Sequence, residues 1–292
     1  MFNNVAIEKV REYWNQRPCN IRHSPSPIGT KQYFDEVEAR KYFVEPHIPI
    51  FAEFVEALPH LTPRPASHGS VFEKWKGKKV LEIGCGIGTD TINFARAGAK
   101  VAAVEISEKS LDLAQQRAKV YNLENRIKFY LGNAEELSKF VPPEKYDLIY
   151  SFGVIHHTPY PEKVMEEIKK YTKSGTVIKI MVYHRYSWKV FWILFAFGKG
   201  AFWKLNKIVA QHSEAQTGSP VTYTYSKREV RKLLKGFKIA DISIEHIFPY
   251  KISDYIKYRY KKVWYFRYLP KAVFSWLEKH FGWHLLINAE KE

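Results

Sequence analysis

The sequence predicts an α/β protein with a doubly wound, mostly parallel sheet, and three observations lead to this fold class. From Lys78 onward, short apolar segments of strand type alternate with single helical segments. A glycine-rich turn, LEIGCGIGTD at residues 81–90, follows the first apolar segment. The 292 residues are 46% hydrophobic, which is enough for the core of one large domain. Strands joined by single helices favour right-handed crossovers and therefore a parallel sheet.

Each element of this fold follows from its own residue pattern. Short β-rich runs predict strands at 78–83, 100–106, 127–132, 146–151, 175–184, 237–247 and 283–289. Helical patterns occupy 89–98, 107–122, 161–172 and 226–237. Ser107 is a suitable N-cap for the second of these helices. Pro161 suits the first turn of the third helix, where an amide N–H would have no helical partner.

The two flanks of this alternating region differ from it in composition. Residues 1–70 are rich in proline and show helical patterns at 33–44 and 48–58, so they predict an N-terminal helical cap. Residues 71–183 form the predicted cofactor-binding core. Residues 184–292 are expected to complete the sheet and to carry helical, aromatic and basic inserts over the substrate. The three parts are expected to act as one catalytic domain.

The charge of the chain predicts an anionic partner or surface. The formal net charge is +16, and residues 184–292 contain 20 Lys and Arg against 8 Asp and Glu, interleaved with aromatic residues. Nucleic acid, an anionic membrane surface and an anionic substrate all fit such a surplus, and so does a soluble protein that is simply rich in lysine.

Other features concern the compartment in which the chain is expected to work. The two cysteines, Cys19 and Cys85, are too few for a disulfide framework and lack CxxC zinc spacing. The first residues lack the apolar core of a signal peptide. The apolar run at 190–198 is far shorter than the roughly 20 residues that span a bilayer. A reducing, cytoplasmic setting is therefore expected.

The spacing of the glycine turn limits the nucleotides that it can bind. Glycines stand at 84, 86 and 88, whereas the dinucleotide fingerprint GxGxxG would need one at position 89, where Thr89 stands. This disfavours a nicotinamide-dependent oxidoreductase. The absence of GK[ST] excludes a triphosphate P-loop. A helix–strand junction that needs tight packing is the simpler explanation of the turn taken alone.

Acidic and amide residues at the strand ends favour a positively charged nucleoside cofactor. Glu82 can hold an ammonium group, while the glycines let a nucleoside approach the backbone. Glu105 ends the second strand, where a carboxylate can accept both ribose hydroxyls. Asn133 and Ala134 follow the third strand, where a side-chain amide can contact an adenine edge.

Four motifs in this order carry a resemblance to a known family. VLEIGCGIG, AVEIS, GNAEEL and YDLIYSFGVIHH resemble the successive cofactor motifs of class I S-adenosylmethionine-dependent methyltransferases, in the subgroup of ubiquinone-biosynthesis-type enzymes. The resemblance covers about residues 70–182. It implies seven strands with an antiparallel last strand, and S-adenosyl-L-methionine as the cofactor.

The resemblance also implies roles for individual residues. Those expected at the cofactor are Glu82, Gly84, Cys85, Gly86, Gly88, Glu105, Ile106, Asn133, Ala134 and Phe152, with Tyr33 as part of a lid. Within this set, Cys85 is expected to fill a tight space and not to act as a nucleophile.

The acceptor is expected beside SFGVIHHTP, after the fourth strand. His157, or else His156, can take a proton from a hydroxyl or an acidic carbon, and Tyr183 is a further catalytic candidate. Alternatively, one histidine packs and the other bonds the backbone. Adjacent histidines without a third ligand at usual spacing do not indicate a metal site, so none is predicted.

Absent motifs narrow the class of acceptor. SFGV stands where base N-methylating enzymes carry [DN]PP[YF], and the fourth strand ends in Ser151 and Phe152 without a magnesium-binding aspartate or a nucleophilic cysteine. Paired glutamates typical of protein-arginine enzymes are not found in place. A small or lipid-like acceptor, apolar or amphipathic, is therefore predicted, and nucleic acid is disfavoured.

The aromatic, basic stretches of the last third leave three interpretations. They can be core and lid packing, a peripheral contact with an anionic membrane at its inner face, or a nucleic-acid-binding surface. Two other functions also remain open. One is a non-catalytic scaffold that binds S-adenosylmethionine at a membrane or on RNA, and the other is an RNA methyltransferase.

Overall fold

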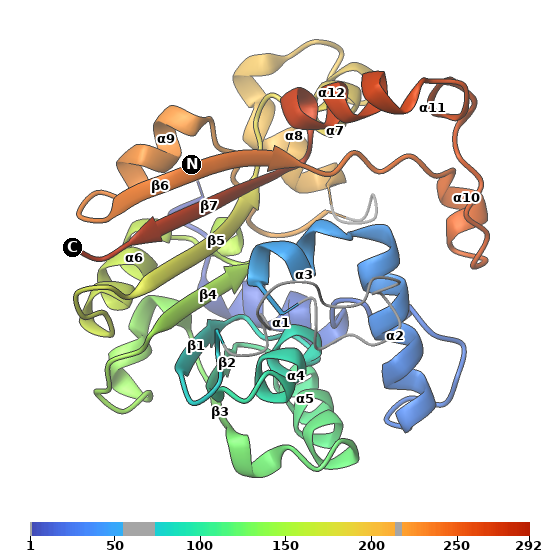
Figure 1. Cartoon of the computed structure of the whole chain (residues 1–292). Helices are drawn as coiled ribbons and strands as arrows, with labels where there is room; N and C mark the ends of the chain where they lie inside the picture. Colours follow the sequence, from blue (N-terminus) through green and yellow to red (C-terminus); the bar gives the residue numbers. More distant parts are fainter. Residues whose placement is uncertain (1, 55–73, 214–217) are drawn as a thin grey trace.

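A computed structural model describes residues 2–54, 74–213 and 218–292 of the chain. Its centre is a seven-stranded sheet in the order β3-β2-β1-β4-β5-β7-β6 (Figure 1). The strands are β1 (Lys79–Ile83), β2 (Lys100–Glu105), β3 (Ile127–Leu131), β4 (Leu148–Phe152), β5 (Val177–Tyr183), β6 (Lys238–Glu245) and β7 (His284–Glu290). All seven coincide with segments that the sequence predicts as strands.

The directions of the strands confirm the predicted α/β fold class. Strands β1 to β5 pair in parallel, and β7 runs antiparallel to both β5 and β6. The chain order reverses at β1, between β2 on one side and β4 on the other. In open sheets of this kind, ligands bind outside the carboxyl ends of the strands at such a reversal.

Helices cover both faces of the sheet (Figure 1). They are α1 (Ile7–Gln16), α2 (Lys31–Val44), α3 (His47–Ala52), α4 (Thr89–Arg96), α5 (Glu108–Val120), α6 (Pro161–Lys170), α7 (Trp188–Ala196), α8 (Leu205–His212), α9 (Lys227–Leu233), α10 (Ile252–Tyr255), α11 (Trp264–Arg267) and α12 (Lys271–Phe281). Short 3₁₀ turns are η3 (Glu124–Arg126), η4 (Ala134–Lys139), η5 (Ile155–His157) and η6 (Phe202–Lys204). None of the helices in the described ranges is long and apolar enough to cross a bilayer.

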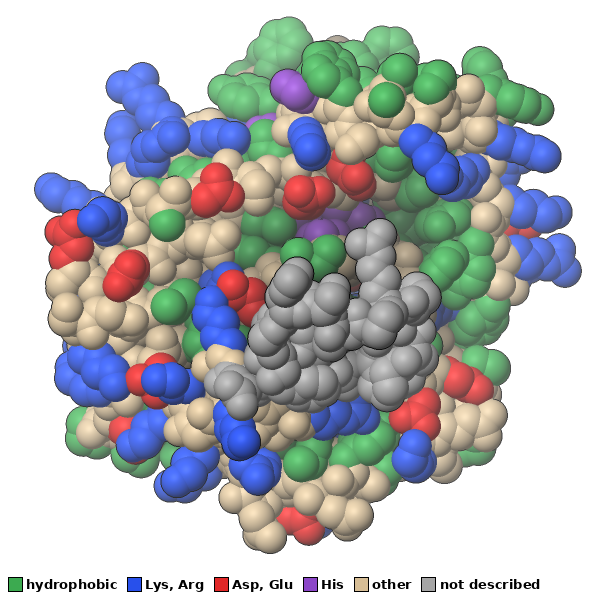
Figure 2. All heavy atoms as spheres, viewed as in Figure 1, with side chains coloured by type: hydrophobic (Ala, Val, Ile, Leu, Met, Phe, Trp, Pro, Cys, Tyr) green, Lys and Arg blue, Asp and Glu red, His purple; other side chains and the backbone are tan. Residues whose placement is uncertain are grey.

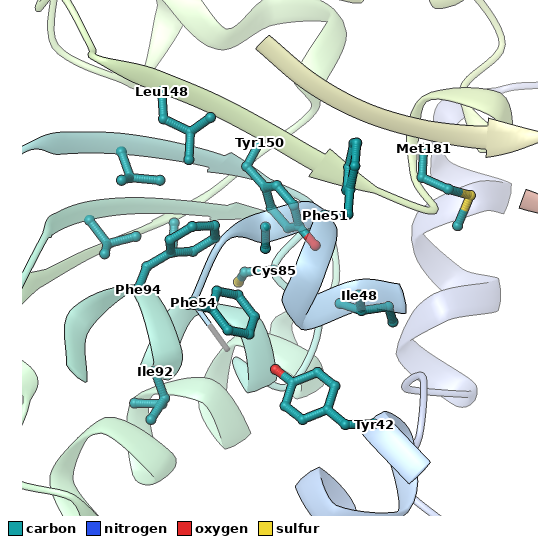
Figure 3. Close-up of a cluster of buried hydrophobic side chains, with 14 of the residues drawn as sticks. Tyr42, Ile48, Phe51, Phe54, Cys85, Ile92, Phe94, Leu148, Tyr150 and Met181 are labelled. Carbon is teal, nitrogen blue, oxygen red and sulfur yellow. The ribbon is translucent and has the colours of Figure 1, made fainter. Parts of the chain in front are cut away.

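Each face of the sheet buries its own hydrophobic core. On one face, side chains of α3, α4 and α5 pack against β1, β2 and β4. Figure 3 shows part of this core, in which the ring of Phe94 lies 5.1 Å from that of Phe54 and 5.0 Å from that of Tyr150. On the other face, α6 and α9 pack against β4, β5 and β7. The central strands β1, β2, β4 and β5 are buried on both faces, which explains their continuous apolar runs.

The N-terminal region departs in part from its prediction. The predicted helix at 33–44 is α2, whereas α1 forms in a part of the cap where no helical segment is predicted. The helix predicted at 48–58 ends at Ala52, because Glu53 adopts a left-handed backbone with φ of 60°. The remainder of that prediction, from residue 55, lies outside the described residues.

Candidate functional site

A cavity of about 300 Å³ opens at the carboxyl ends of β1, β2, β4 and β5. It lies where the strand order reverses, and its volume falls within the range of small-molecule sites. Most of the residues that the sequence predicts for the site lie on its wall. They are Glu82, Gly84, Cys85, Gly86, Glu105, Ile106, Asn133, Ala134, Phe152, His157 and Tyr183.

The three glycines of the turn have different structural surroundings. All have positive φ, which disfavours a side chain. A Cβ on Gly84 would lie 2.1 Å from a methyl carbon of Val154, so the turn and the β4 loop approach too closely for alanine. At Gly86 a Cβ would meet nothing within 4 Å, which leaves its backbone open. Gly88 is not on the cavity wall; it precedes α4, where a Cβ would lie 3.0 Å from Ala114.

Glu105 is held as a preoriented acceptor at the end of β2. Its Oε2 accepts the Gly86 N–H at 2.8 Å, and its Oε1 accepts the N–H groups of Ile106 and Ser107 at 3.0 Å each. Burial raises the pKa of Glu105, and the three backbone donors oppose that rise. The carboxylate can therefore accept further donors, such as a pair of vicinal hydroxyls, without first losing side-chain freedom.

Glu82 lies deeper, beside a second buried acid. Its Oε2 accepts the Thr91 hydroxyl at 2.5 Å. The neighbouring Asp90 accepts hydrogen bonds from Lys41 at 2.7 Å and from Tyr42 and Tyr150 at 2.9 Å each. Burial, with the negative charge of Asp90, raises the pKa of Glu82 to about 8. A cationic ligand group beside Glu82 would favour its ionised form.

The raised pKa of Glu82 predicts how stability depends on pH. The protonated form is favoured in the folded chain, so its stabilising effect is complete below pH 4.5 and is lost as the pH rises to about 8. Glu82→Gln cannot ionise. We therefore expect the unliganded variant to be more stable than the wild type at pH 9, by on the order of a few kcal/mol, and to differ less at pH 5.

Urea unfolding at pH 5, 7 and 9 measures this difference. The exposed Glu124→Gln serves as the control and should follow the wild type at each pH. A gap between Glu82→Gln and the wild type that stays constant with pH would contradict the prediction.

Two further predicted site residues are Asn133, which comes after β3, and Cys85, which lies within the glycine turn. The Asn133 side chain accepts the backbone N–H of Glu135 at 3.0 Å and so caps η4. Its amide group is thereby oriented on the cavity wall beside Ala134. Burial raises the pKa of Cys85 well above its usual value, so its thiol stays protonated, in agreement with the packing role expected for it.

The two adjacent histidines occupy different environments. His157 lines the cavity, and its Nδ1 lies 2.7 Å from the carbonyl oxygen of Val221. This contact assigns the N–H to Nδ1 and leaves Nε2 as a proton acceptor. His156 is fully buried with its ring 3.8 Å from that of Tyr183, and it is not on the cavity wall. Burial holds the pKa of His156 well below its usual value, so it is neutral.

The expected lid role of Tyr33 has no support in the position of that residue. Its side chain is completely buried, its ring packs on Phe34, and its hydroxyl donates to the carbonyl oxygen of Ile21 at 2.9 Å. These contacts tie the start of α2 to the preceding loop. Tyr33 therefore packs the cap and does not reach the cavity.

Other residues of the wall were missed by the sequence interpretation. They are Trp14 from α1, Lys41 and Glu45 from α2 and its end, Asp90 from α4, Met181 from β5 and His284 from β7. Asp90, adjacent to the glycine turn, is the one with a local signal. The others come from distant segments and show no motif.

Three histidines gather near the start of β7, and one of them, His284, lies on the cavity wall. His47 Nε2 lies 2.8 Å from His284 Nδ1, and the rings of His246 and His284 stack at 4.7 Å. Burial lowers the pKa of His47 to about 4 and holds those of His246 and His284 well below the usual value. All three rings are therefore neutral. Nothing in the sequence spacing 47, 246 and 284 indicates this group.

Comparison with known proteins identifies a matching family. The sequence model of a family described as a methyltransferase domain matches residues 74–249, which is more than half of the chain. A ubiquinone biosynthesis O-methyltransferase of Azoarcus sp. is 31% identical over 102 residues, which are 35% of this chain and 42% of that protein. The chain thus matches less than half of the length of this curated relative.

Solved structures resemble the chain over almost its whole length. The magnesium protoporphyrin IX methyltransferase of Synechocystis, with S-adenosylhomocysteine bound, has a TM-score of 0.57 and 17% identity, and the match covers 98% of this chain and 100% of that one. The geranyl diphosphate C-methyltransferase of Streptomyces coelicolor has a TM-score of 0.55 and 15% identity, with 100% and 98% covered. At these low sequence identities, the similarity shows that the chains share a fold.

Proposed function

The chain belongs to the class I S-adenosylmethionine-dependent methyltransferases, and on this premise we propose that it methylates an oxygen, carbon or nitrogen atom of a small, apolar or amphipathic molecule. One observation carries the proposal. Residues of the glycine turn, Glu82, Glu105, His157 and Tyr183 all line one cavity. A cofactor side and an acceptor side thus face the same space.

The residues of the cofactor side fit S-adenosylmethionine. Glu82 offers a carboxylate for its ammonium group, Glu105 offers two oxygens for the ribose hydroxyls, and Asn133 offers an amide for the adenine edge. The open backbone at Gly86 admits the ribose closely. When bound, the cofactor supplies an electrophilic methyl group on a positively charged sulfur.

The residues of the acceptor side suit an apolar molecule with one ionisable proton. Phe152, Met181 and Tyr183 supply apolar wall, and His157 is a residue there that can accept a proton. Its Nδ1–H is directed to the Val221 carbonyl, which fixes the ring, and the proposed step is proton transfer from an acceptor hydroxyl or acidic carbon to Nε2. The chain thereby aligns the acceptor and removes its proton.

Isothermal titration with S-adenosylmethionine and with S-adenosylhomocysteine tests the cofactor half of this proposal. We expect one site per chain with micromolar affinity for each. Absence of binding at millimolar concentration would refute the methyltransferase function. A screen of hydroxylated aromatic and isoprenoid acceptors then tests turnover.

His157→Gln tests the catalytic half with any acceptor that the screen yields. General-base catalysis contributes roughly 10²–10⁴-fold, so kcat should fall by about that factor while cofactor affinity stays unchanged. His212→Gln, at a half-buried histidine of α8, is the control. Unchanged kcat in His157→Gln would remove the base role, and retained cofactor binding without turnover of any acceptor would favour the scaffold alternative.

We further propose that the last third of the chain contacts an anionic membrane. An aromatic face exposes large rings of α7, η6, α11 and α12, which are Phe191, Phe195, Phe202, Trp203, Trp264, Tyr268, Trp276 and Phe281. Figure 2 shows hydrophobic side chains gathered at this end of the molecule, above basic side chains at its flanks. Phe195 is 81% and Trp203 77% exposed, so core packing does not account for them.

The composition of this face suits a lipid interface. Trp188 contacts Tyr265 and Phe266 at ring distances of 6.1 Å, so α7 and α11 form one surface. The segments that carry these rings also contain or adjoin exposed basic residues, which are Lys199, Lys204, Lys207, Lys261, Lys262, Arg267 and Lys271. Aromatic rings insert at the headgroup level while lysine and arginine stay with anionic lipids. A lipid-like acceptor would then reach the cavity from the membrane.

Sedimentation with liposomes tests the membrane contact. We expect binding to vesicles with anionic lipid, weakened by 0.5 M salt. The double variant Phe195→Ser with Trp203→Ser should bind about tenfold more weakly, because two apolar side chains no longer enter the interface. Ile28→Ser, at an exposed apolar residue elsewhere, is the control. Equal binding to neutral and anionic vesicles would contradict the proposal.

A further inference from the structure

We propose that Glu45, His246 and His284 bind a divalent first-row transition-metal ion at the acceptor end of the cavity. One ligand atom from each residue lies within 4.8 Å of the others. Two imidazoles and one carboxylate form the donor set of many catalytic zinc and non-haem iron sites. This inference departs from the sequence prediction, which includes no metal site.

The antiparallel end of the sheet places the two histidines side by side. His284 begins β7 opposite Glu245, the last residue of β6, and His246 follows directly. The Trp283 N–H donates to the His246 carbonyl at 2.7 Å, which extends the pairing of β6 with β7 by one residue on each strand. His246 has a left-handed backbone with φ of 73°, which a residue other than glycine adopts only where its surroundings impose it.

The distances between the candidate ligand atoms are close to those between ligand atoms around a coordinated metal ion. His284 Nε2 is 3.6 Å from Glu45 Oε1. Bonds of about 2.1 Å in tetrahedral geometry place ligand atoms roughly 3.4 Å apart. The widest pair must therefore close by about 1.4 Å at most. Glu45 stands at the end of α2 and is only partly buried, so its carboxylate can make that adjustment.

His47 holds the ring of His284 in the orientation that a ligand needs. The contact of 2.8 Å occupies Nδ1 of His284 and leaves Nε2 directed toward Glu45. Metal-binding histidines regularly have their second nitrogen fixed by such a partner. His47 is thus a positioning residue for the site, in which His246 and His284 are buried.

The site faces the cavity and so has a place for a substrate atom. Glu45 and His284 lie on the cavity wall with Phe152 and Met181. In the space-filling view, histidine side chains are visible in a hollow of this face (Figure 2). Three protein ligands leave a coordination position that an acceptor hydroxyl or carboxylate oxygen can take. That role rests on the proposed function, whereas metal binding does not.

Cobalt titration of the full chain, freed of metal with a chelator, tests the site. We expect one equivalent of Co²⁺ with visible absorption bands of low coordination number, displaced by Zn²⁺ and not by Mg²⁺, because magnesium prefers oxygen ligands. S-adenosylhomocysteine titration of the same sample reports the cofactor site separately. Cofactor binding without stoichiometric cobalt binding would overturn the metal site alone.

Variants identify the ligands. His246→Asn should weaken cobalt binding by about 100-fold, and Glu45→Cys should add a near-ultraviolet thiolate-to-cobalt band. His212→Asn, outside the group, should bind as the wild type does. Circular dichroism checks that each variant folds, and the new band in Glu45→Cys reports the site even if His246→Asn does not fold. Wild-type affinity in His246→Asn, or no new band in folded Glu45→Cys, would overturn the assignment.

Discussion

Arg117→Ala is expected to lower the free energy of unfolding by about 3–5 kcal/mol, because it breaks a buried ion pair and removes one of the positive charges that compensate the buried Glu38 carboxylate. Arg117 is completely buried in α5. Its guanidinium donates to Thr89 Oγ1 at 2.7 Å, to the Phe34 carbonyl at 3.1 Å and to Glu38 Oε2 at 3.1 Å. It thereby links α2, α4 and α5.

Removal of Arg117 takes away one of the positive charges that stabilise the buried Glu38 carboxylate. Its side chain is 2% exposed, and it keeps an ion pair with Arg96, whose Nη1 lies 2.8 Å away and which is itself partly exposed. Urea unfolding measures the loss, with Lys119→Ala on the exposed side of the same helix as the control. The double variant Arg117→Met with Glu38→Leu should recover part of the loss, since no buried charge then remains. A loss below 1 kcal/mol in Arg117→Ala would contradict the role assigned to the pair.

Glu105→Gln is expected to weaken S-adenosylmethionine binding by roughly 100-fold or more. A hydrogen bond to a charged group contributes about 1.5–3 kcal/mol, and two ribose hydroxyls are expected to share this carboxylate. In the wild type, Oε2 of Glu105 accepts the N–H of Gly86 and Oε1 accepts those of Ile106 and Ser107, so in the variant an amide NH₂ must face one of these two sets of donors. The turn must therefore rearrange before it can accept the ribose.

Isothermal titration measures this change, and thermal unfolding of the unliganded variant shows whether the turn is intact. Glu108→Gln, at an exposed glutamate in the first turn of α5, is the matched control and should bind as the wild type does. An affinity within threefold of wild type in Glu105→Gln would show that the ribose is bound elsewhere.

The cofactor side of the cavity was predictable because it is built locally. Glu82, the glycine turn and Glu105 each stand at the end of a strand that its own apolar run reveals, and parallel strands bring such ends to one edge. The family resemblance implied that Gly88 lies at the cofactor and that Tyr33 is part of a lid. In the structure, Gly88 lies against Ala114 at the start of α4, and the Tyr33 hydroxyl donates to the Ile21 carbonyl. Neither residue is on the cavity wall.

The acceptor side was not predictable in the same way. Lys41 and Glu45 come from α2, and His284 from β7, so more than two hundred residues of chain separate parts of one wall. No periodicity or spacing links them. The exposure of the aromatic face was equally hidden, because a run such as residues 190–198 has the same composition whether it is buried or lies at a surface.

By itself, the sequence determined which segments form strands, that most of these strands run parallel, and which acids stand at the strand ends. These features depend on residues that are close together in the chain. Only the tertiary structure decided which distant side chains meet, as when the β6–β7 pairing and the end of α2 bring His246, His284 and Glu45 together. The physical reason is that burial, pKa and coordination depend on neighbours in space. Those neighbours follow from the packing of the whole chain.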